Sequence, residues 1–392
     1  MLKNLVAIAV IFCGASLAWM VLGETLASRT ADSDNAQQAQ LGTQWGGAQT
    51  QKAPAVFSRE RRPQADRYVP IESSRVNVAL DLTQRRKGLL WYNLYDVAFL
   101  ARYVVRNTTN SPHLYVELPV PNSGGSYADL AYRVGGRQID NTEAINGVVD
   151  FVLKPNEATS LSVAYRSRGI ESWVYQFNGG VASVRNFELT MVTNFKAIDF
   201  PPKTLLPSSE VPRGGGWLLQ WKYATLVTGN GIGMTIPYPL QPGPLAQRIT
   251  FWAPVSLLFY IFVMLLITTL RGIDLHPMNY FFLACAFFAF HLLLAYLVDR
   301  IPLEVAFTIC SIVSMFLTIT YLRLVVGLRF AAVEAGVAQL IYLVLFSYAL
   351  FNEGWAGLTI TIGAIITLFV AMQLTGRIRW SERFASAQQP VA

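Results

Sequence analysis

The sequence has few of the residues on which soluble enzymes and disulfide-stabilised secreted domains depend. Charged residues make up 14% of the 392 residues, against about 25% in an average soluble domain. The three cysteines, Cys13, Cys285 and Cys310, all lie in apolar runs, so neither a disulfide framework nor a zinc cluster is expected. Hydrophobic residues nevertheless make up 53% of the chain, which excludes an intrinsically disordered protein. The composition therefore favours a membrane protein with a folded part outside the bilayer.

Residues that carry catalysis are also scarce. Histidine, the usual general base, occurs three times, as His113, His276 and His291, and the HExxH, CxxC and GxSxG motifs are absent. The glycine-rich segment 229–233 has no helix signal after it, so it predicts a turn and not a phosphate site. The net charge of +7 is spread along the chain without a basic stripe. We therefore expect no enzymatic activity, no cofactor, no metal site and no nucleic-acid partner.

Six apolar runs are long enough to cross a bilayer, which takes about 20 residues of helix. The first is 5–22, and polar breaks divide the last part of the chain into five more, near 251–270, 278–298, 303–322, 337–351 and 355–374. The run 337–351 is short and is expected to borrow residues from its flanks. The prediction is one N-terminal helix followed by a cluster of five.

The basic residues of the short loops predict the orientation, because they favour the cytoplasmic side. If Lys3 is inside, the alternation of the spans places six arginines on the same side: Arg271, Arg323, Arg329, Arg377, Arg379 and Arg383. Among the short outer loops, only one carries a basic residue, Arg300. We expect both termini in the cytoplasm and residues 24–249 outside.

The first apolar run has an alternative interpretation as a cleaved signal peptide. Residues 25–27 (TLA) resemble a small-residue cleavage site. The run 5–22 is longer than the usual apolar core of a signal peptide, about 7–15 residues, which favours an uncleaved anchor.

The segment between the first two spans has two unlike parts. Residues 24–66 are rich in Ala, Gln, Asp and Ser without strand alternation, and predict a helical extension or linker. From residue 67 the pattern changes to period two at 75–82, 161–166 and 217–226, and 132–139 predicts a hairpin with a Gly-Gly turn. These features predict a large all-β, sandwich-like domain over 67–249.

The predicted order of parts is an anchor at 1–23, the extension or linker, the β domain, a five-helix bundle at 250–375 and a cytoplasmic tail at 376–392. Prolines crowd the end of the β domain, at Pro237, Pro239, Pro242 and Pro244. We expect a stiff extended connector there, neither strand nor helix. A flexible linker is the alternative, although Gly/Ser composition would suit it better.

Polar residues inside the spans are the candidate site residues, because burying them unpaired is costly. His291 shares one face of the third span with Ala295 and Asp299. A helix-packing hydrogen bond or a proton relay would each explain this arrangement.

Two stripes of small and hydroxyl residues run along the fourth and sixth spans. The first consists of Thr308, Ser311, Ser314 and Thr318, and the second of Thr359, Gly363 and Thr367. Such stripes are typical of close helix packing in lipid, so we expect Gly363 to be buried against another helix. The lining of a cavity is the alternative.

Five segments carry a resemblance to a known family: 44–50 (QWGGAQT), 85–92 (RRKGLLWY), 251–259 (FWAPVSLLF), 276–280 (HPMNY) and 375–380 (TGRIRW). They resemble the CreD family of bacterial inner-membrane proteins, which are also described as colicin-tolerance or envelope-integrity proteins. The resemblance implies a role in cell-envelope integrity or in a stress response under two-component control. It supplies no catalytic residues, since no enzymatic activity defines the family.

The leading functional hypothesis is a non-enzymatic protein of the bacterial inner membrane, multi-pass, with a periplasmic β domain. The partners expected are membrane lipid and an envelope protein or other periplasmic component bound by the β domain. The alternative is a small-solute or proton-linked transporter that uses the helix bundle and His291.

Overall fold

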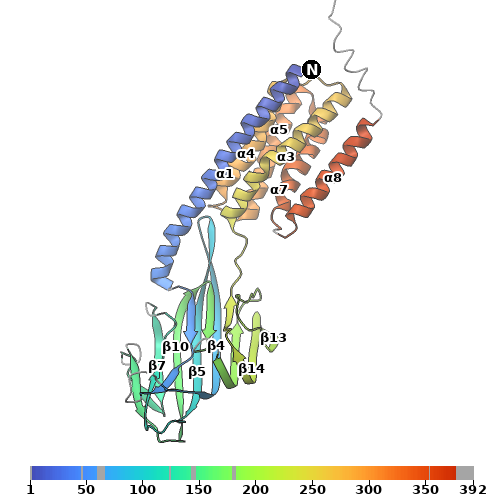
Figure 1. The fold of residues 1–392 in the computed structure, drawn as a ribbon. Helices are drawn as coiled ribbons and strands as arrows, with labels where there is room; N and C mark the ends of the chain where they lie inside the picture. The colour runs from blue at the N-terminus through green and yellow to red at the C-terminus, as the bar shows by residue number, and fades with distance from the viewer. Residues whose placement is uncertain are drawn as a thin grey trace, which may run out of the picture. The chain divides into compact units, whose positions relative to one another are not determined.

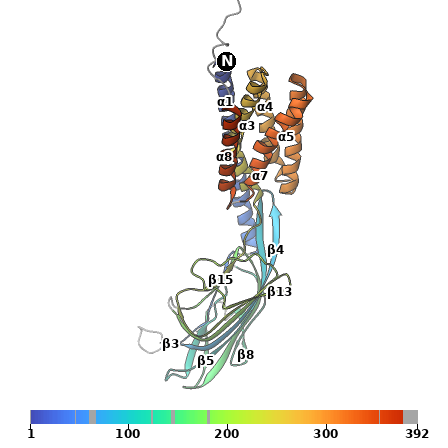
Figure 2. The same ribbon diagram turned by 90° about the vertical axis from the view of Figure 1, so that its right-hand side faces the viewer.

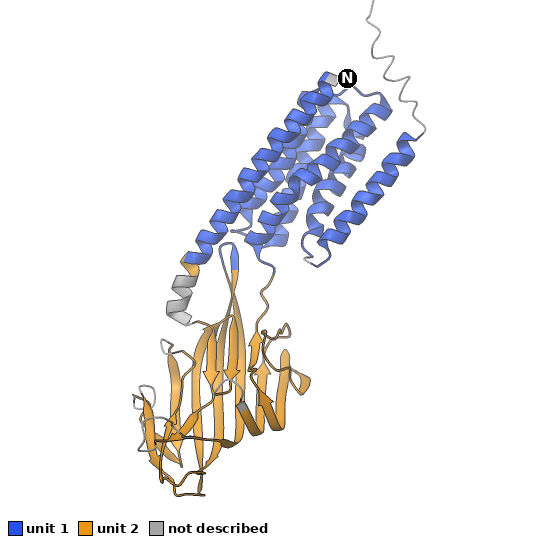
Figure 3. Ribbon diagram, in the orientation of Figure 1, with its two compact units in different colours: residues 1–35, 87–90, 240–392 blue, residues 36–86, 91–239 orange. Residues whose placement is uncertain are grey.

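The computed structural model describes residues 2–45, 47–59, 67–122, 125–142, 147–178, 182–352 and 354–376. The chain forms two compact units, which Figure 3 shows in different colours. The helical unit comprises residues 1–35, 87–90 and 240–392, and the β unit comprises 36–86 and 91–239. The expected cytoplasmic tail lies outside the described residues apart from Gly376.

The helical unit confirms the predicted number of spans. Among the described residues, six helices are long and apolar enough to cross a membrane. They are labelled in Figure 1 and are α1 (Leu2–Trp45), α3 (Pro242–Arg271), α4 (Pro277–Leu297), α5 (Leu303–Val325), the fifth span, and α8 (Ala356–Thr375). The fifth span is made of η1 (Phe330–Ala335), α6 (Gly336–Gln339), η2 (Leu340–Leu345) and α7 (Phe346–Ala349).

The fifth span borrows residues from its N-terminal flank, as expected. It begins at Phe330, seven residues before the apolar run 337–351, and so reaches the length of a membrane crossing. Its segments η1 and η2 are π-helical, a form that occurs as short insertions in α-helices and is frequent at functional sites. Gln339 lies between them, as the last residue of α6.

The expected extended connector is wrong from residue 242 onward, because α3 begins there. Pro242 and Pro244 lie in the first turn, where backbone N–H groups have no partner inside the helix, so proline costs little there. The Gly243 N–H donates to the Leu89 carbonyl over 2.9 Å. A Cβ at Gly243 would lie 2.7 Å from Thr30 Oγ1, which explains the glycine between two prolines.

Aromatic and aliphatic side chains form the core of the helical unit. Trp19 and Leu26 of α1 are fully buried in it. Between α3 and α4 the ring centroids of Tyr260 and Phe287 are 4.6 Å apart. The helix α8 is much less buried than its neighbours, with 11% of its most apolar window inside the structure.

The β unit consists of three sheets. The largest has eight strands in the order β13-β14-β12-β4-β5-β10-β7-β8, and the others have the orders β1-β11-β15 and β3-β2-β6-β9. Figure 2 shows these strands from a second side. The strands are β1 (Gln49–Lys52), β2 (Ala55–Ser58), β3 (Arg67–Val69), β4 (Ile71–Lys87), β5 (Leu90–Arg106), β6 (His113–Glu117), β7 (Tyr127–Val134), β8 (Arg137–Ile139), β9 (Val148–Val152), β10 (Ala158–Ile170), β11 (Ser172–Gln176), β12 (Ala182–Thr193), β13 (Ser209–Arg213), β14 (Gly216–Thr228) and β15 (Ile232–Thr235).

One hydrophobic core joins the three sheets. It contains Tyr95 and Phe99 of β5 in the large sheet, Trp173 of β11 and Val116 of β6. The alternation seen in the sequence corresponds to this core, because β4 buries Val76, Val78 and Leu80 and exposes the residues between them or leaves them half-buried. The prediction of a large all-β domain between the first and second helices is therefore confirmed.

The hairpin at 132–139 is present, with Val134 paired to Arg137 around Gly135 and Gly136. The expected division at residue 67 is wrong, since β1 and β2 already lie within 24–66. The sequence pattern did not reveal β1, because its inward residues are polar. Gln49 and Gln51 are both 2% exposed and hydrogen-bonded inside the β unit. The expected helical extension corresponds to α1, which continues to Trp45, whereas residues 60–66 lie outside the described ones.

Candidate functional site

The β unit contains a cleft of about 490 Å³. Pockets of about 300–1,000 Å³ hold small ligands. Residues of β2 and β3, the ends of β6 and β11 and the beginning of β12 line it, and most are apolar: Ala53, Pro54, Ala55, Val56, Tyr68, Val69, Pro70, Ile71, Ser74, Glu117, Tyr175, Phe177, Asn178, Ser183 and Val184. The cleft can therefore take a ligand with an apolar body.

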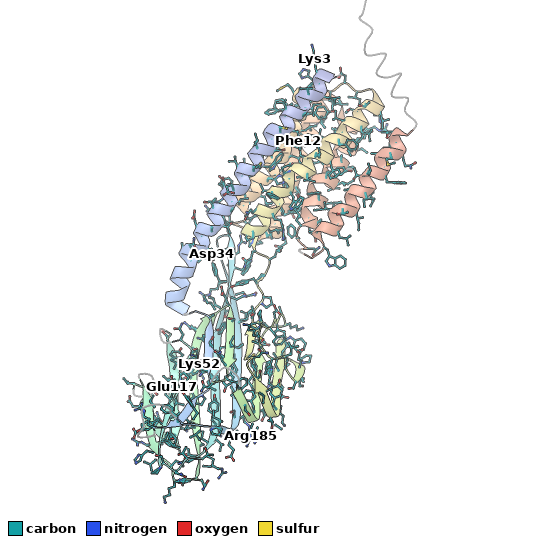
Figure 4. The ribbon with its side chains drawn as sticks, in the orientation of Figure 1. Lys3, Phe12, Asp34, Lys52, Glu117 and Arg185 are labelled. Carbon is teal, nitrogen blue, oxygen red and sulfur yellow. The ribbon has the colours of Figure 1, made fainter. Side chains whose placement is uncertain are left out.

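Three side chains give the cleft its polar and aromatic chemistry. Tyr68 presents a ring that is 68% exposed. Glu117, labelled in Figure 4, is exposed at the end of β6 and offers carboxylate oxygens as hydrogen-bond acceptors. The Asn178 Nδ2 is buried and has no hydrogen-bond partner among the described residues, so it is an unused donor. A ligand that both donates and accepts hydrogen bonds would satisfy the two polar groups.

The aromatic residues at the cleft are packed into the core of the β unit. The Tyr175 hydroxyl lies 3.3 Å from the Tyr103 hydroxyl, and Phe177 packs edge-on against Tyr175 and Phe187. Burial raises the pKa of Tyr103 and of Tyr175. Both phenols are therefore neutral at physiological pH, and the deep wall of the cleft carries no charge.

The strand β1 is held beside the cleft by buried amides. The Tyr165 hydroxyl donates to Gln51 Oε1 over 2.8 Å, and the Gln51 Nε2 donates to the Pro119 carbonyl over 2.8 Å. The Gln49 Nε2 donates to the Ser167 hydroxyl and to the Arg168 carbonyl. These bonds fix the position of the residues that follow β1, of which Ala53 and Pro54 line the cleft.

In the helical unit, the structure places His291 and Ala295 on the face of α4 that meets α1, and Asp299 follows in the turn after the helix. His291 is fully buried, with its Nδ1 3.0 Å from the Phe287 carbonyl and its ring edge-on to Trp19 at 5.5 Å. Among the described residues, neither His291 Nε2 nor Trp19 Nε1 has a hydrogen-bond partner.

Ala295 and Asp299 contact Arg29 of α1. The guanidinium donates to the Ala295 carbonyl over 3.0 Å and to the Asp299 carboxylate over 3.2 Å. It also lies 5.0 Å from the centre of the Tyr296 ring. The predicted common face therefore serves to attach α1 to α4, which the sequence pattern of α4 alone could not show.

The stripe on α5 is divided by the structure. Ser311, Ser314 and Thr318 are buried, whereas Thr308 is exposed. Ser314 donates to the Ala286 carbonyl of α4 over 2.6 Å and accepts from the Gln339 Nε2 over 2.8 Å. Sequence reasoning missed Gln339, an amide in the middle of an apolar span, although a polar residue at that depth is itself a signal.

The stripe on α8 is only partly buried. Thr367 is buried, and its hydroxyl lies 2.8 Å from the Tyr342 hydroxyl of the fifth span. Gly363 and Thr359 are exposed, and no heavy atom lies within 4 Å of a Cβ built on Gly363. The burial of Gly363 against another helix is therefore wrong. The two residues line a small apolar groove of about 140 Å³ instead, together with Phe259 and Tyr342.

Within the described residues, no group of three or more His, Cys, Asp or Glu side chains is arranged to hold a metal ion. The polar features that remain are the cleft of the β unit and the bonded pair Ser314–Gln339 inside the helical unit. The cleft offers one carboxylate beside neutral groups, whereas the Ser314–Gln339 pair is neutral.

Comparison with known proteins identifies a family for part of the chain. No curated protein matches the chain. Residues 227–381, which include β15 and the five helical spans from α3 to α8, match the model of the family described as inner membrane protein CreD. Over these residues the match confirms the resemblance to the CreD family of inner-membrane proteins that the sequence segments indicate.

Proposed function

We propose that this chain is a non-enzymatic, multi-pass inner-membrane protein whose β unit binds another component of the cell envelope, in support of envelope integrity or of a stress response. The observation that carries the proposal is the cleft, with the exposed Tyr68 and the two unlike polar groups Glu117 and Asn178 on an otherwise apolar lining. The six spans make the helical unit suitable as the membrane platform.

The lining of the cleft favours binding over catalysis. Among the described residues that form it, Glu117 is the single carboxylate, and histidine and cysteine are not represented. General acid–base chemistry usually needs a second titratable group within hydrogen-bond reach of the first. A non-catalytic site is the simplest role for this set of residues.

The proposed orientation has both termini in the cytoplasm and the β unit in the periplasm. It is supported by Lys3, Arg271, Arg323 and Arg329, which alternation along the spans brings to one side. The uncleaved anchor is supported by Trp19 and Leu26, because cleavage after Ala27 would remove both from the core of the helical unit.

A transporter is the second candidate. It is favoured by the Ser314–Gln339 pair, which lies fully buried between α5 and a span that contains two π-helical segments. The function would be detected as solute or proton flux into liposomes that is lost in His291→Ala or Gln339→Leu. Flux that neither substitution changes would count against it.

The binding function is tested by photo-cross-linking in intact cells. The photoreactive residue p-benzoylphenylalanine is placed at Tyr68 in the cleft, or at Val227, which is also 68% exposed but does not line the cleft. We expect a discrete adduct from position 68 that is absent from position 227. The additional change Ser183→Trp, which adds bulk to an exposed residue of the lining, should remove the adduct. Equal adducts from both positions would contradict the proposal.

The orientation is tested with reporter fusions. Alkaline phosphatase, which is active only outside the cytoplasm, should be active when fused after Asp150 and inactive when fused after Arg383. The same result at both positions would contradict the proposed orientation.

A further inference from the structure

The outward face of the sheet β3-β2-β6-β9 carries a row of aromatic rings. Tyr68 of β3 and Tyr115 of β6 are both paired with Phe57 of β2, so the three side chains lie on one face. The ring centroids of Phe57 are 5.9 Å from those of Tyr68 and Tyr115, and the planes of Phe57 and Tyr115 differ by 22°. The row is a cross-strand aromatic platform that ends at Tyr68.

Charged residues of both signs surround this row. Arg59 lies over Tyr115, with its guanidinium carbon 4.6 Å from the ring centre. Glu117 is two residues beyond Tyr115 on the same strand, and Asp150 is paired with Tyr115, so both point to the same face and both are exposed. A face that carries two carboxylates and one guanidinium is poorly suited to a polyanion such as a nucleic acid, which requires a basic surface.

The aromatic row and the cleft are continuous, because Tyr68 belongs to both. Glu117, which also lines the cleft, lies on the same face as the row. Asn178 also lines the cleft, and its Nδ2 is a buried donor without a partner among the described residues. The combined surface therefore offers an exposed ring, an acceptor and a donor, between the rigid apolar walls that Pro54 and Pro70 provide.

We propose that this surface binds an oligosaccharide chain, with one sugar ring on Tyr68 and its hydroxyls between Glu117 and Asn178. A sugar ring has an apolar C–H face that packs on an aromatic ring, and its hydroxyls both donate and accept hydrogen bonds. The Glu117 carboxylate accepts from one hydroxyl, and the buried Asn178 Nδ2 donates to a hydroxyl or acetamide oxygen after its side chain turns into the cleft. This inference rests on the proposed function and specifies its partner as a carbohydrate of the envelope.

The test is a titration of the full-length protein with the tetrasaccharide of β-1,4-linked N-acetylglucosamine, followed by calorimetry or saturation-transfer NMR. The protein is held in phospholipid nanodiscs, because detergents with sugar headgroups would compete. We expect saturable binding of one tetrasaccharide. Tyr68→Ala should raise the Kd about tenfold, which corresponds to about 1.4 kcal/mol, and Ser183→Trp should abolish binding.

Two further variants keep the result interpretable. Tyr223→Ala removes a half-buried tyrosine of β14 that does not line the cleft, and it should leave the Kd unchanged. Glu117→Gln retains the side-chain shape and should weaken binding less than Tyr68→Ala does. If Tyr68→Ala fails to fold, Glu117→Gln still tests the site.

The outcomes separate this inference from the proposed function. No binding by the unmodified protein, together with a protein adduct from the cross-linker at Tyr68, would overturn the carbohydrate inference and leave the binding function in place. Binding that survives both Tyr68→Ala and Ser183→Trp would overturn the site. The absence of both the adduct and the tetrasaccharide complex would overturn the two proposals together.

Discussion

The β unit and the helical unit satisfy their buried polar side chains in different ways. In the β unit the amides of Gln49, Gln51, Asn93 and Asn107 donate to backbone carbonyls of segments distant in sequence. Such carbonyls are available because strand ends and loops leave them without ladder partners. Each buried amide therefore joins two particular segments and contributes to the specificity of the fold.

In the helical unit several buried hydroxyls bond within their own helix. Thr250, Thr268 and Ser311 each donate to the carbonyl four residues earlier. A hydroxyl satisfied in this way needs no neighbouring helix, since the helix supplies its acceptor. Buried polar residues therefore indicate tertiary contacts in the β unit. In the helical unit only those that bond across helices do so, such as Ser314 and Gln339.

The largest effect is expected from the core of the β unit. Trp221 is fully buried, and its Nε1 donates to the Leu205 carbonyl over 2.9 Å. Trp221→Ala should lower the free energy of unfolding of this unit by about 3–5 kcal/mol. Urea unfolding followed by near-ultraviolet circular dichroism measures the change. The control Trp252→Ala, which alters an exposed residue of α3, should leave that transition in place. Equal effects of the two substitutions would mean that the transition does not report the β unit separately from the helical unit.

The next largest loss of stability is expected at the hydrogen bond between Ser314 of α5 and Gln339 of the fifth span. Ser314→Ala leaves the buried Gln339 Nε2 without its acceptor and should cost about 1–2 kcal/mol. Gln339→Met should cost less, because Ser314 keeps its bond to the Ala286 carbonyl. Thermal unfolding of the purified protein in detergent measures both. A larger loss from Gln339→Met would mean that this amide makes further contacts.

The sequence predicts the parts of the fold in which periodicity follows burial. Val76, Val78 and Leu80 alternate because one face of β4 meets the core, and the apolar runs follow the length needed to cross a membrane. Sequence reasoning failed at β1, because buried Gln49 and Gln51 resemble linker residues until their partners are known. Those partners, Ser167 and Pro119, lie far away along the chain.

The candidate site was less predictable than the fold. The cleft combines residues from β2–β3, β6 and β11–β12, and no local pattern brings Tyr68, Glu117 and Asn178 together. In the helical unit, sequence spacing assigned His291 and Asp299 to one face, but their neighbours Trp19 and Arg29 come from a helix more than 250 residues away in sequence. Spacing defines a face of a helix, and tertiary packing decides what meets it.

A smaller effect on stability is expected at two buried tyrosines of the β unit, of which Tyr165 has a hydrogen-bond partner and Tyr132 has none among the described residues. Burial raises the pKa of Tyr132 to about 12, whereas an unfolded tyrosine ionises near pH 10. The neutral phenol thus contributes stability that is complete below about pH 10 and is lost as the pH rises to about 12. Tyr132→Phe should therefore flatten the loss of stability between these pH values. Urea unfolding at pH 7 and at a series of higher pH values measures this.

At pH 7 the same change should be neutral or slightly stabilising, because the Tyr132 hydroxyl has no hydrogen-bond partner among the described residues. The matched control is Tyr165→Phe, which removes the bond to Gln51 and should cost about 1 kcal/mol. Equal losses from the two changes at pH 7 would show that Tyr132 is hydrogen-bonded in solution.

The smallest effect is expected at α8, where the structure corrects the sequence. Gly363 is exposed beside the groove formed with Phe259 and Tyr342, so Gly363→Leu meets open space and should change the stability of the bundle by less than about 0.5 kcal/mol. Thr367→Val should cost about 0.6 kcal/mol, since it removes the bond to Tyr342. Thermal unfolding in detergent ranks the two, with the exposed Thr359→Val as a control. If Gly363→Leu disrupted the bundle while Thr367→Val did not, another helix would have to cover this face in the membrane. Because α8 is the least buried of the described spans, that helix would have to come from a second molecule.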